Sequence, residues 1–186
     1  MAALRIRLFP DPVLRQRCRE VDVFDLELAA LARDMVETMY HAPGIGLAAP
    51  QVGVERRLAV VDLSVGEDPA QLLTLVNPEV VEHEGLETES EGCLSIPEFN
   101  EKVVRPERIR VVAQSLEGER FELEARGLLA RAIQHEIDHL DGVLFVDRLQ
   151  GLRRERAKRH LRRLLRDAET EEEGAGEGRA ALSRSP

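Results

Sequence analysis

The chain has 186 residues, of which 43% are apolar and 33% are charged, and its formal net charge is −9. This length and balance are typical of one soluble globular domain and exclude an intrinsically disordered chain. No apolar run approaches the roughly 20 residues of a membrane span, and two cysteines are too few for a disulfide scaffold. Arg5 and Arg7 also interrupt the stretch where a signal peptide would be apolar, so we expect a protein of the reducing cytoplasm with no membrane partner.

The first half of the chain predicts one helix, a glycine-rich segment and two strands. Residues 25–41 repeat apolar side chains at a helical period, and Asp25 is placed to cap the start of this helix. Residues 41–53 contain three glycines and two prolines, which exclude a regular helix and predict a tight loop or extended segment. Residues 57–63 and 72–81 have the composition of strands.

The second half predicts a hairpin over 107–124 with its turn at Glu117-Gly118, and then a buried helix over 128–140 that ends at Asp141-Gly142. A basic amphipathic helix over about 147–167 completes a single domain of residues 1–167, and a disordered acidic tail is expected over 168–186. After the first helix, strands precede helices, and no helix is evident between residues 57 and 125. The predicted fold is therefore α+β, with antiparallel β-sheets packed around a central helix and followed by a C-terminal helix.

The strongest chemical signal lies in that central helix, in the segment His135-Glu136-Ile137-Asp138-His139. Histidines four residues apart project from one helix face and can bind one divalent ion, with Glu136 beside the metal instead of on it. The motif is short enough to arise by chance, in which case these are ordinary helix histidines. Apolar flanks place the helix in the core, where unpaired polar groups cost about 1–3 kcal/mol each, and this favours a metal site.

A catalytic metal of this type needs a third protein ligand and an open fourth position. Downstream, Glu155 lies in an arginine-dense helix and is a poor ligand. Upstream, Cys93 is a better candidate, because the adjacent Gly92 permits unusual backbone geometry. Taken alone, a lone cytoplasmic cysteine is more often a small buried core residue, which is our interpretation of Cys18.

Three segments together resemble the motifs of the peptide deformylase family, in the family's order. They are GIGLAAPQVG at 44–53, EGCLS at 91–95 and QHEIDHLDG at 134–142. The resemblance spans roughly residues 4–150, with Pro50 where many members have Thr. It implies an enzyme that removes the formyl group from the N-formylmethionine of nascent polypeptides and releases formate.

The resemblance also implies roles for individual residues. The implied metal ligands are Cys93, His135 and His139. Glu136 is implied as general acid/base, and Gln51 and the backbone N–H of Leu94 as donors to the developing oxyanion. From its loop alone, Gln51 is better explained as an amide that ties down its own backbone.

We expect one divalent metal ion, and two lines of reasoning favour different metals. Two nitrogens and one thiolate suit Zn²⁺, which binds more tightly than Fe²⁺ in the divalent affinity order. The resemblance implies Fe²⁺ in cells, with Ni²⁺ or Co²⁺ as working substitutes and Zn²⁺ often a weaker one.

The substrate needs a backbone partner and an apolar pocket. Glycine lets a substrate strand approach closely, so Ile45 and Gly46 are expected to contact the substrate main chain; the plainer interpretation is a turn. The methionine pocket is expected from Leu128 and Ala132, closed by Leu94 and Ile45. Leu128 and Ala132 fit an ordinary core equally well. Glu91 is expected to pair with Arg105, because both charges are otherwise awkward near a buried metal.

Residues 151–167 hold eight basic and two acidic side chains. A solvated helix face explains such a run, and docking to ribosomal RNA is the functional alternative, which the resemblance supports. Two other functions compete with a deformylase. One is a metallopeptidase that cleaves internal peptide bonds. The other is a ribosome-associated binding protein with a structural metal, although structural sites are usually closed by four protein ligands.

Overall fold

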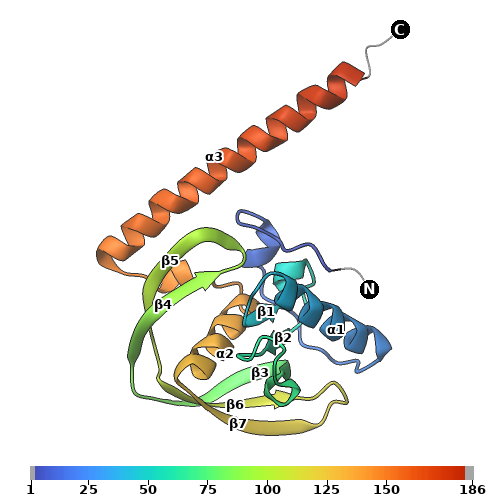
Figure 1. Cartoon of the computed structure of the whole chain (residues 1–186), viewed down its shortest axis with the longest axis vertical. Coiled ribbons are helices and arrows are strands. Elements are labelled where there is room, and N and C mark those ends of the chain that lie inside the picture. The colour runs from blue at the N-terminus through green and yellow to red at the C-terminus, as the bar shows by residue number, and fades with distance from the viewer. Residues whose placement is uncertain (1–2, 183–186) are drawn as a thin grey trace.

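The structure, a computed structural model, describes residues 3–182 (Figure 1). Its longer helices are α1 (Leu26–His41), α2 (Gly127–Leu140) and α3 (Gly151–Leu182). Short 3-10 turns are η1 (Pro12–Arg15), η2 (Ala49–Val52), η3 (Pro69–Gln71) and η4 (Phe145–Arg148). The strands are β1 (Gly46–Ala48), β2 (Leu58–Val61), β3 (Leu73–Glu84), β4 (Glu87–Cys93), β5 (Ile96–Arg105), β6 (Arg108–Gln114) and β7 (Arg120–Arg126).

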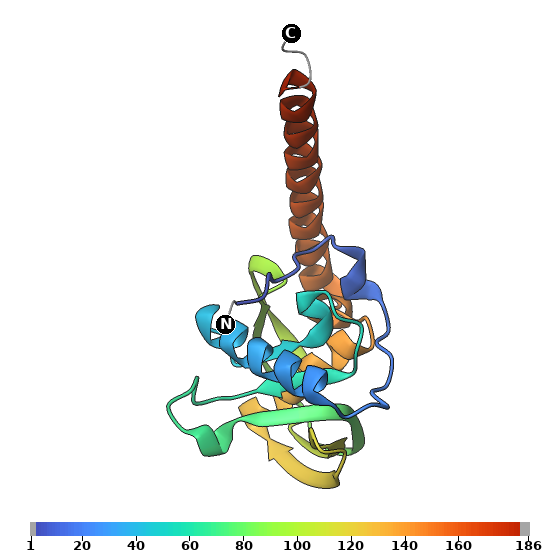
Figure 2. The same cartoon turned by 90° about the vertical axis from the view of Figure 1, so that its right-hand side faces the viewer.

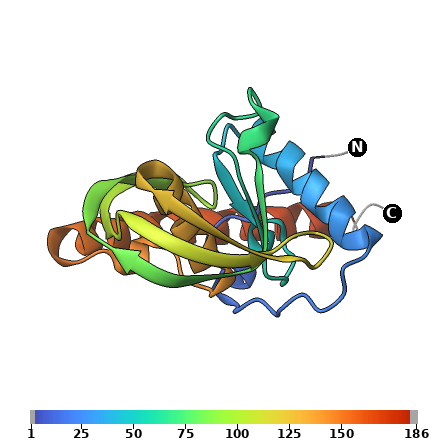
Figure 3. The same cartoon turned by 90° about the horizontal axis from the view of Figure 1, so that it is seen from below.

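The strands form two antiparallel sheets. The larger sheet has the order β1-β2-β3-β6-β7, so β1 lies at one edge, and the smaller sheet is the β4–β5 hairpin. In Figure 1, α2 lies between the large sheet and this hairpin. Seen from below, α1 and the β4–β5 hairpin lie at opposite ends of the body (Figure 3). This is the α+β antiparallel architecture that the sequence predicts.

Three large apolar clusters, with a fourth small one around Cys18, fill the spaces between these layers. The first packs α1 on β1 and β2 through side chains such as Leu28, Met35 and Leu47. The second packs the apolar face of α2, including Ile133, on the large sheet. The third joins β5, η4 and α3 around Phe145. Because α2 is covered on both sides, its polar side chains are forced into a buried environment.

Most predicted elements are confirmed. The first helix begins at Leu26, and the Asp25 carboxylate accepts a hydrogen bond from the Leu28 N–H at 2.9 Å, as expected of an N-cap. The hairpin turns at Gly118, whose φ of 84° suits glycine. Cys18 is a buried core residue in contact with apolar neighbours, as predicted. Between residues 3 and 182, no helix combines the length and the apolar character of a membrane span.

The sequence analysis missed both strands of the smaller sheet. β4 has the sequence ETESEGC and exposes most of its side chains. With Thr88 as its one β-branched residue, it lacks the run of β-branched and aromatic residues and the alternation that mark a strand. Its conformation comes from pairing with β5, in a register that runs from Glu87 opposite Arg105 to Cys93 opposite Ile96.

The C-terminal helix differs from its predicted bounds at both ends. It begins at Gly151 instead of about residue 147, because Asp147 serves another element: its carboxylate accepts a hydrogen bond from the Leu144 N–H at 2.8 Å and closes the η4 turn. Residues 168–182, predicted as a disordered tail, continue α3 as helical backbone, since extending a helix requires no new nucleation. Figures 1 and 2 show this helix leaving the body. The rest of the predicted tail, 183–186, lies outside the described residues.

Candidate metal centre

Three potential metal-binding side chains converge from β4 and α2. Cys93 ends β4, and His135 and His139 lie one turn apart on α2. One ligand atom from each residue lies within 4.8 Å of the other two, and the Cys93 Sγ is 3.2 Å from the His139 Nε2. One ion can therefore contact all three side chains, as the sequence analysis expects of these residues.

Local irregularities bring Cys93 to the histidines. The β4–β5 register shifts between Glu91 and Cys93, and an irregularity of this kind redirects the side chain that follows it. On α2, the four-residue spacing places both imidazoles on one face, with ring centroids 5.0 Å apart. The cysteine therefore comes from a distorted strand end and the histidines from a regular helix.

The electrostatics of Cys93 favour the form that binds metals. Burial opposes ionisation of the thiol, but the neighbouring imidazoles of His139 and His135 outweigh it and hold the pKa of Cys93 well below its usual value. The thiolate is the metal-binding form of cysteine. Soft sulfur with two imidazoles is a donor set that divalent transition metals accept, and three protein ligands leave a fourth position open.

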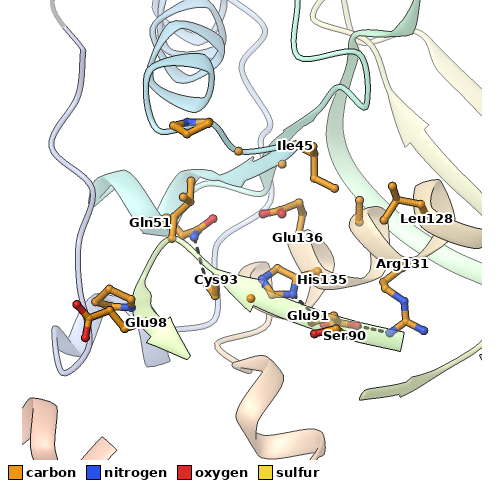
Figure 4. Close-up of a pocket in the computed structure, with 17 residues that line it drawn as sticks. Ile45, Gln51, Ser90, Glu91, Cys93, Glu98, Leu128, Arg131, His135 and Glu136 are labelled. Atoms are coloured by element: carbon orange, nitrogen blue, oxygen red, sulfur yellow. Dashed lines mark hydrogen bonds and ion pairs between the residues drawn. The ribbon is translucent and has the colours of Figure 1, made fainter. Parts of the chain in front are cut away.

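In Figure 4, Glu136 lies beside Cys93 and His135, two of the three candidate ligands, and it is 4% exposed. Its Oε2 is buried and has no hydrogen-bond partner among residues 3–182. Burial raises the pKa of Glu136 to about 7. A buried carboxyl with a free oxygen and a near-neutral pKa is suited to exchange protons with a bound molecule.

Position 46 must be a glycine because its backbone lies close to the Glu136 side chain. A Cβ built at Gly46 would lie 2.3 Å from the Glu136 Oε1, which is closer than real Cβ contacts. Any larger residue would therefore displace Glu136. This constraint is separate from the predicted approach of a substrate strand, and the sequence analysis did not anticipate it.

Glu91 is the centre of a buried network of charges. Its carboxylate accepts two hydrogen bonds from Arg105, at 2.6 and 2.8 Å, and one from Arg131 at 2.6 Å. The Glu91 Oε2 also lies 3.0 Å from the His135 Nδ1. Burial would raise the pKa of Glu91, but the hydrogen bonds from His135 and Arg105 lower it to about 2. The predicted Glu91–Arg105 pair is present, and it orients a candidate metal ligand.

Asp138, three residues after His135 on α2, extends this network through Arg105. Arg105 donates to its Oδ2 at 2.8 Å, and Arg148 donates to both of its oxygens, through Nε at 2.6 Å and through Nη2. His135, Asp138 and His139 thus each have a polar partner in the core. The sequence analysis missed the roles of Asp138, Arg131 and Arg148. The signal for the arginines was Asp138 itself, because a carboxylate buried in the core needs a cation nearby.

Replacing Arg105 with alanine is expected to lower the free energy of unfolding by about 3–5 kcal/mol. The side chain is 2% exposed, and its loss removes two of the hydrogen bonds to Glu91 and one to Asp138, so both buried carboxylates lose part of their pairing. Urea unfolding measures the change. Arg108→Ala is the matched control, because Arg108 pairs with Glu124 at the surface, and exposed pairs contribute about 0–1 kcal/mol. Normal stability and metal content in Arg105→Ala would contradict the role of this pair.

The two ends of the Gln51 amide point to different partners, one to the local backbone and one to the candidate metal centre. Its Oε1 accepts a hydrogen bond from the Ala48 N–H at 2.9 Å, so one end of the amide ties down the local backbone. Its Nε2 points the other way, toward the Ser95 Oγ at 3.1 Å and the Cys93 Sγ at 3.6 Å. An N–H donor therefore faces the candidate metal centre. Ser95, which helps to hold this amide, was another residue that the sequence analysis missed.

A cavity of about 500 Å³ opens onto these residues (Figure 4). Its lining includes all five of the predicted substrate-binding residues, which are Ile45, Gly46, Leu94, Leu128 and Ala132. Ala132 is 6% exposed and Leu128 is 56% exposed, so Leu128 is not an ordinary core residue. The cavity also borders Gln51, Cys93, His135 and Glu136. The sequence-predicted residues are thus brought together around one space.

The chain is similar in sequence and in fold to known deformylases. The family model described as "Polypeptide deformylase" matches residues 3–155. A peptide deformylase of Acidobacterium capsulatum is 53% identical over 161 residues, covering 87% of this chain and 95% of that protein. One of Alkalilimnicola ehrlichii is 54% identical over 166 residues, covering 89% and 93%. The crystal structure of a peptide deformylase from Legionella pneumophila superimposes with a TM-score of 0.82 at 40% identity and covers 100% of both chains.

Proposed function

The chain belongs to the polypeptide deformylase family, and on that premise we propose that Cys93, His135 and His139 hold one divalent metal ion in its active site. The family activity is metal-dependent removal of the formyl group from N-formylmethionine at the start of nascent polypeptides, with release of formate. The observation that carries the assignment is the convergence of these three side chains next to the unpartnered carboxylate oxygen of Glu136.

A divalent ion in this position supplies Lewis-acid activation of water at neutral pH. We propose Fe²⁺ as the metal in cells, with Ni²⁺, Co²⁺ and Zn²⁺ able to occupy the same ligands. The thiolate and the two imidazoles support any of these metals, because all accept sulfur and nitrogen donors.

Glu136 is the proposed general acid/base. Its free Oε2 takes the proton from the attacking water, and the same carboxyl then delivers a proton to the leaving amine of methionine. The near-neutral pKa that burial imposes on Glu136 supports both steps, since the group must accept and donate within one cycle.

Gln51 and the backbone N–H of Leu94 are the proposed donors to the oxygen of the formyl group as it gains negative charge. The Gln51 Nε2 already faces Cys93, and its position is held by the bond from Ala48 N–H to Oε1. A preoriented donor of this kind contributes roughly 3–4 kcal/mol to transition-state stabilisation.

The substrate main chain is proposed to lie along Ile45 and Gly46, beside β1. This strand is the edge of the large sheet, and an edge strand offers unpaired backbone groups to an extended peptide. The methionine side chain then enters the part of the cavity bordered by Leu94, Leu128 and Ala132.

Anaerobic purification with metal analysis and a formate-release assay tests these assignments together. We expect about one divalent metal ion per chain, release of formate from formyl-Met-Ala, and no cleavage of the unformylated peptide. Cleavage of internal peptide bonds would instead support a metallopeptidase. A metal-free protein with full activity would contradict the proposed centre.

We propose that the catalytic domain comprises residues 1–167 and that the protein is cytoplasmic. The basic side chains of residues 151–167 are proposed to bind ribosomal RNA. The exposed arginines Arg154, Arg159 and Arg162 lie on α3, which extends away from the body (Figure 2). Phosphate contacts release counterions, so binding should weaken steeply with salt.

Changing Arg159 and Arg162 to glutamate is expected to weaken ribosome binding and to reduce its salt dependence by about one unit of slope per lost phosphate contact. Co-sedimentation with ribosomes over a salt series measures both quantities. Arg120→Glu, an exposed arginine of β7, is the control and should bind normally. Unchanged binding after deletion of residues 151–186 would refute the docking role.

A further inference from the structure

Arg131 is a buried cation at the wall of the substrate cavity. It lies on α2, four residues before His135, so the two side chains share a helix face. The residue is 5% exposed and borders the cavity between the turns that carry Leu128 and His135 (Figure 4). Burying a guanidinium group is costly unless it is fully paired, so its partners indicate its role.

All of the hydrogen-bond partners found for Arg131 lie on the β4–β5 hairpin. Nη1 donates to the Glu91 Oε1 at 2.6 Å and to the Val103 carbonyl at 3.0 Å. Nη2 donates to the Glu87 carbonyl at 3.2 Å. The side chain thus ties α2 to both strands of the smaller sheet, and one of its bonds ends on the carboxylate that contacts His135.

Arg131 and Arg105 hold Glu91 in different ways. Arg105 binds both carboxylate oxygens, whereas Arg131 binds Oε1 alone and anchors that oxygen to the helix that also carries His135. Glu91 Oε2, the other oxygen, lies 3.0 Å from the His135 Nδ1. A helix residue therefore fixes the carboxylate that orients a histidine one turn further along the same helix.

We propose that Arg131 is a positioning residue that connects the wall of the substrate cavity to His135 through Glu91. Through this connection, a change in the distance between α2 and the β4–β5 hairpin would change the orientation of the His135 ring. This inference rests on the proposed ligand set of Cys93, His135 and His139. It adds a residue that touches neither the metal nor the reacting atoms.

The test compares Arg131→Met, Arg131→Lys and Arg110→Met. Methionine keeps an unbranched apolar wall but removes all three hydrogen bonds. Lysine keeps one charge that can reach Glu91 but not the full set of partners. Arg110 is the matched control, because it pairs with Glu82 and Glu122 on the outer face of the sheet. The measurements are Zn²⁺ affinity by chelator competition, the thermal midpoint of the metal-free protein, and kcat and KM for formyl-Met-Ala.

For Arg131→Met we expect Zn²⁺ affinity and kcat to fall roughly 10–100-fold, with KM changed by less than about twofold. Arg131→Lys should recover part of both losses, and Arg110→Met should behave as the unmodified protein. The inference is overturned if Arg131→Met keeps normal affinity and kcat, or if Arg131→Lys loses as much as Arg131→Met. A failure of the unmodified protein to bind Zn²⁺ would instead contradict the ligand set.

Discussion

Changing Glu136 to glutamine is expected to lower kcat for formate release by roughly 10²–10⁴-fold while the metal stays bound. Glutamine has nearly the same shape as glutamate, so it fits in the narrow space beside Gly46. This space is so tight that a Cβ at position 46 would lie 2.3 Å from the Glu136 Oε1. It cannot take a proton from water, and it cannot return one to the leaving amine. Glu136 is not among the three clustered ligands, so metal content should not change.

Formate release and metal analysis on the same preparation separate these two effects. Glu155→Gln is a suitable control, since Glu155 is an exposed residue of α3 that pairs with Lys158. A Glu136→Ala protein that kept both its metal and its full activity would rule out the proposed mechanism. Loss of metal together with activity would instead place Glu136 among the ligands.

Changing His139 to alanine is expected to remove the metal and with it the activity. His139 is 1% exposed, and its Nε2 lies 3.2 Å from the Cys93 Sγ. Loss of a direct ligand should weaken binding by more than the roughly 10–100-fold typical of residues that only support a ligand. Metal analysis after anaerobic purification measures the occupancy.

The control for this variant is His41→Ala, because His41 is an exposed histidine at the end of α1. The Cys93→Ala variant should lose the metal as His139→Ala does, since each removes one of three ligands. If His139→Ala carries as much metal as the unmodified protein, the proposed ligand set is wrong.

The helix α2 explains why the site is rigid. His135 and Glu136 border the cavity, His139 lies against Cys93, and Asp138 points into a cluster of arginines. Packing of Ile133 on the large sheet and of Phe145 beside the His135 ring leaves this helix little freedom to rotate. The ligands are therefore held in place before any metal binds, which lowers the conformational cost of binding.

Much of the fold could be predicted because local patterns determine it. The helical period of 25–41, the hairpin turn at Gly118 and the stop at Asp141-Gly142 depend on neighbouring residues alone. The strands β4 and β5 could not be predicted in this way. The side chains of β4 are largely polar and those of β5 are mixed, and these segments are strands because they pair with each other and because Arg131 and Arg105 join them to α2.

By itself, the sequence determined that two histidines and a glutamate share a short stretch of buried helix, because a four-residue spacing has the same geometry in any helix. Only the tertiary structure decided that Cys93, 46 residues before His139, meets them, and that Gln51 turns its amide toward that thiol. It also placed Arg105 and Arg131 on Glu91. These contacts depend on strand pairing and on a register shift next to Cys93, which are interactions between distant segments that no local pattern of residues encodes.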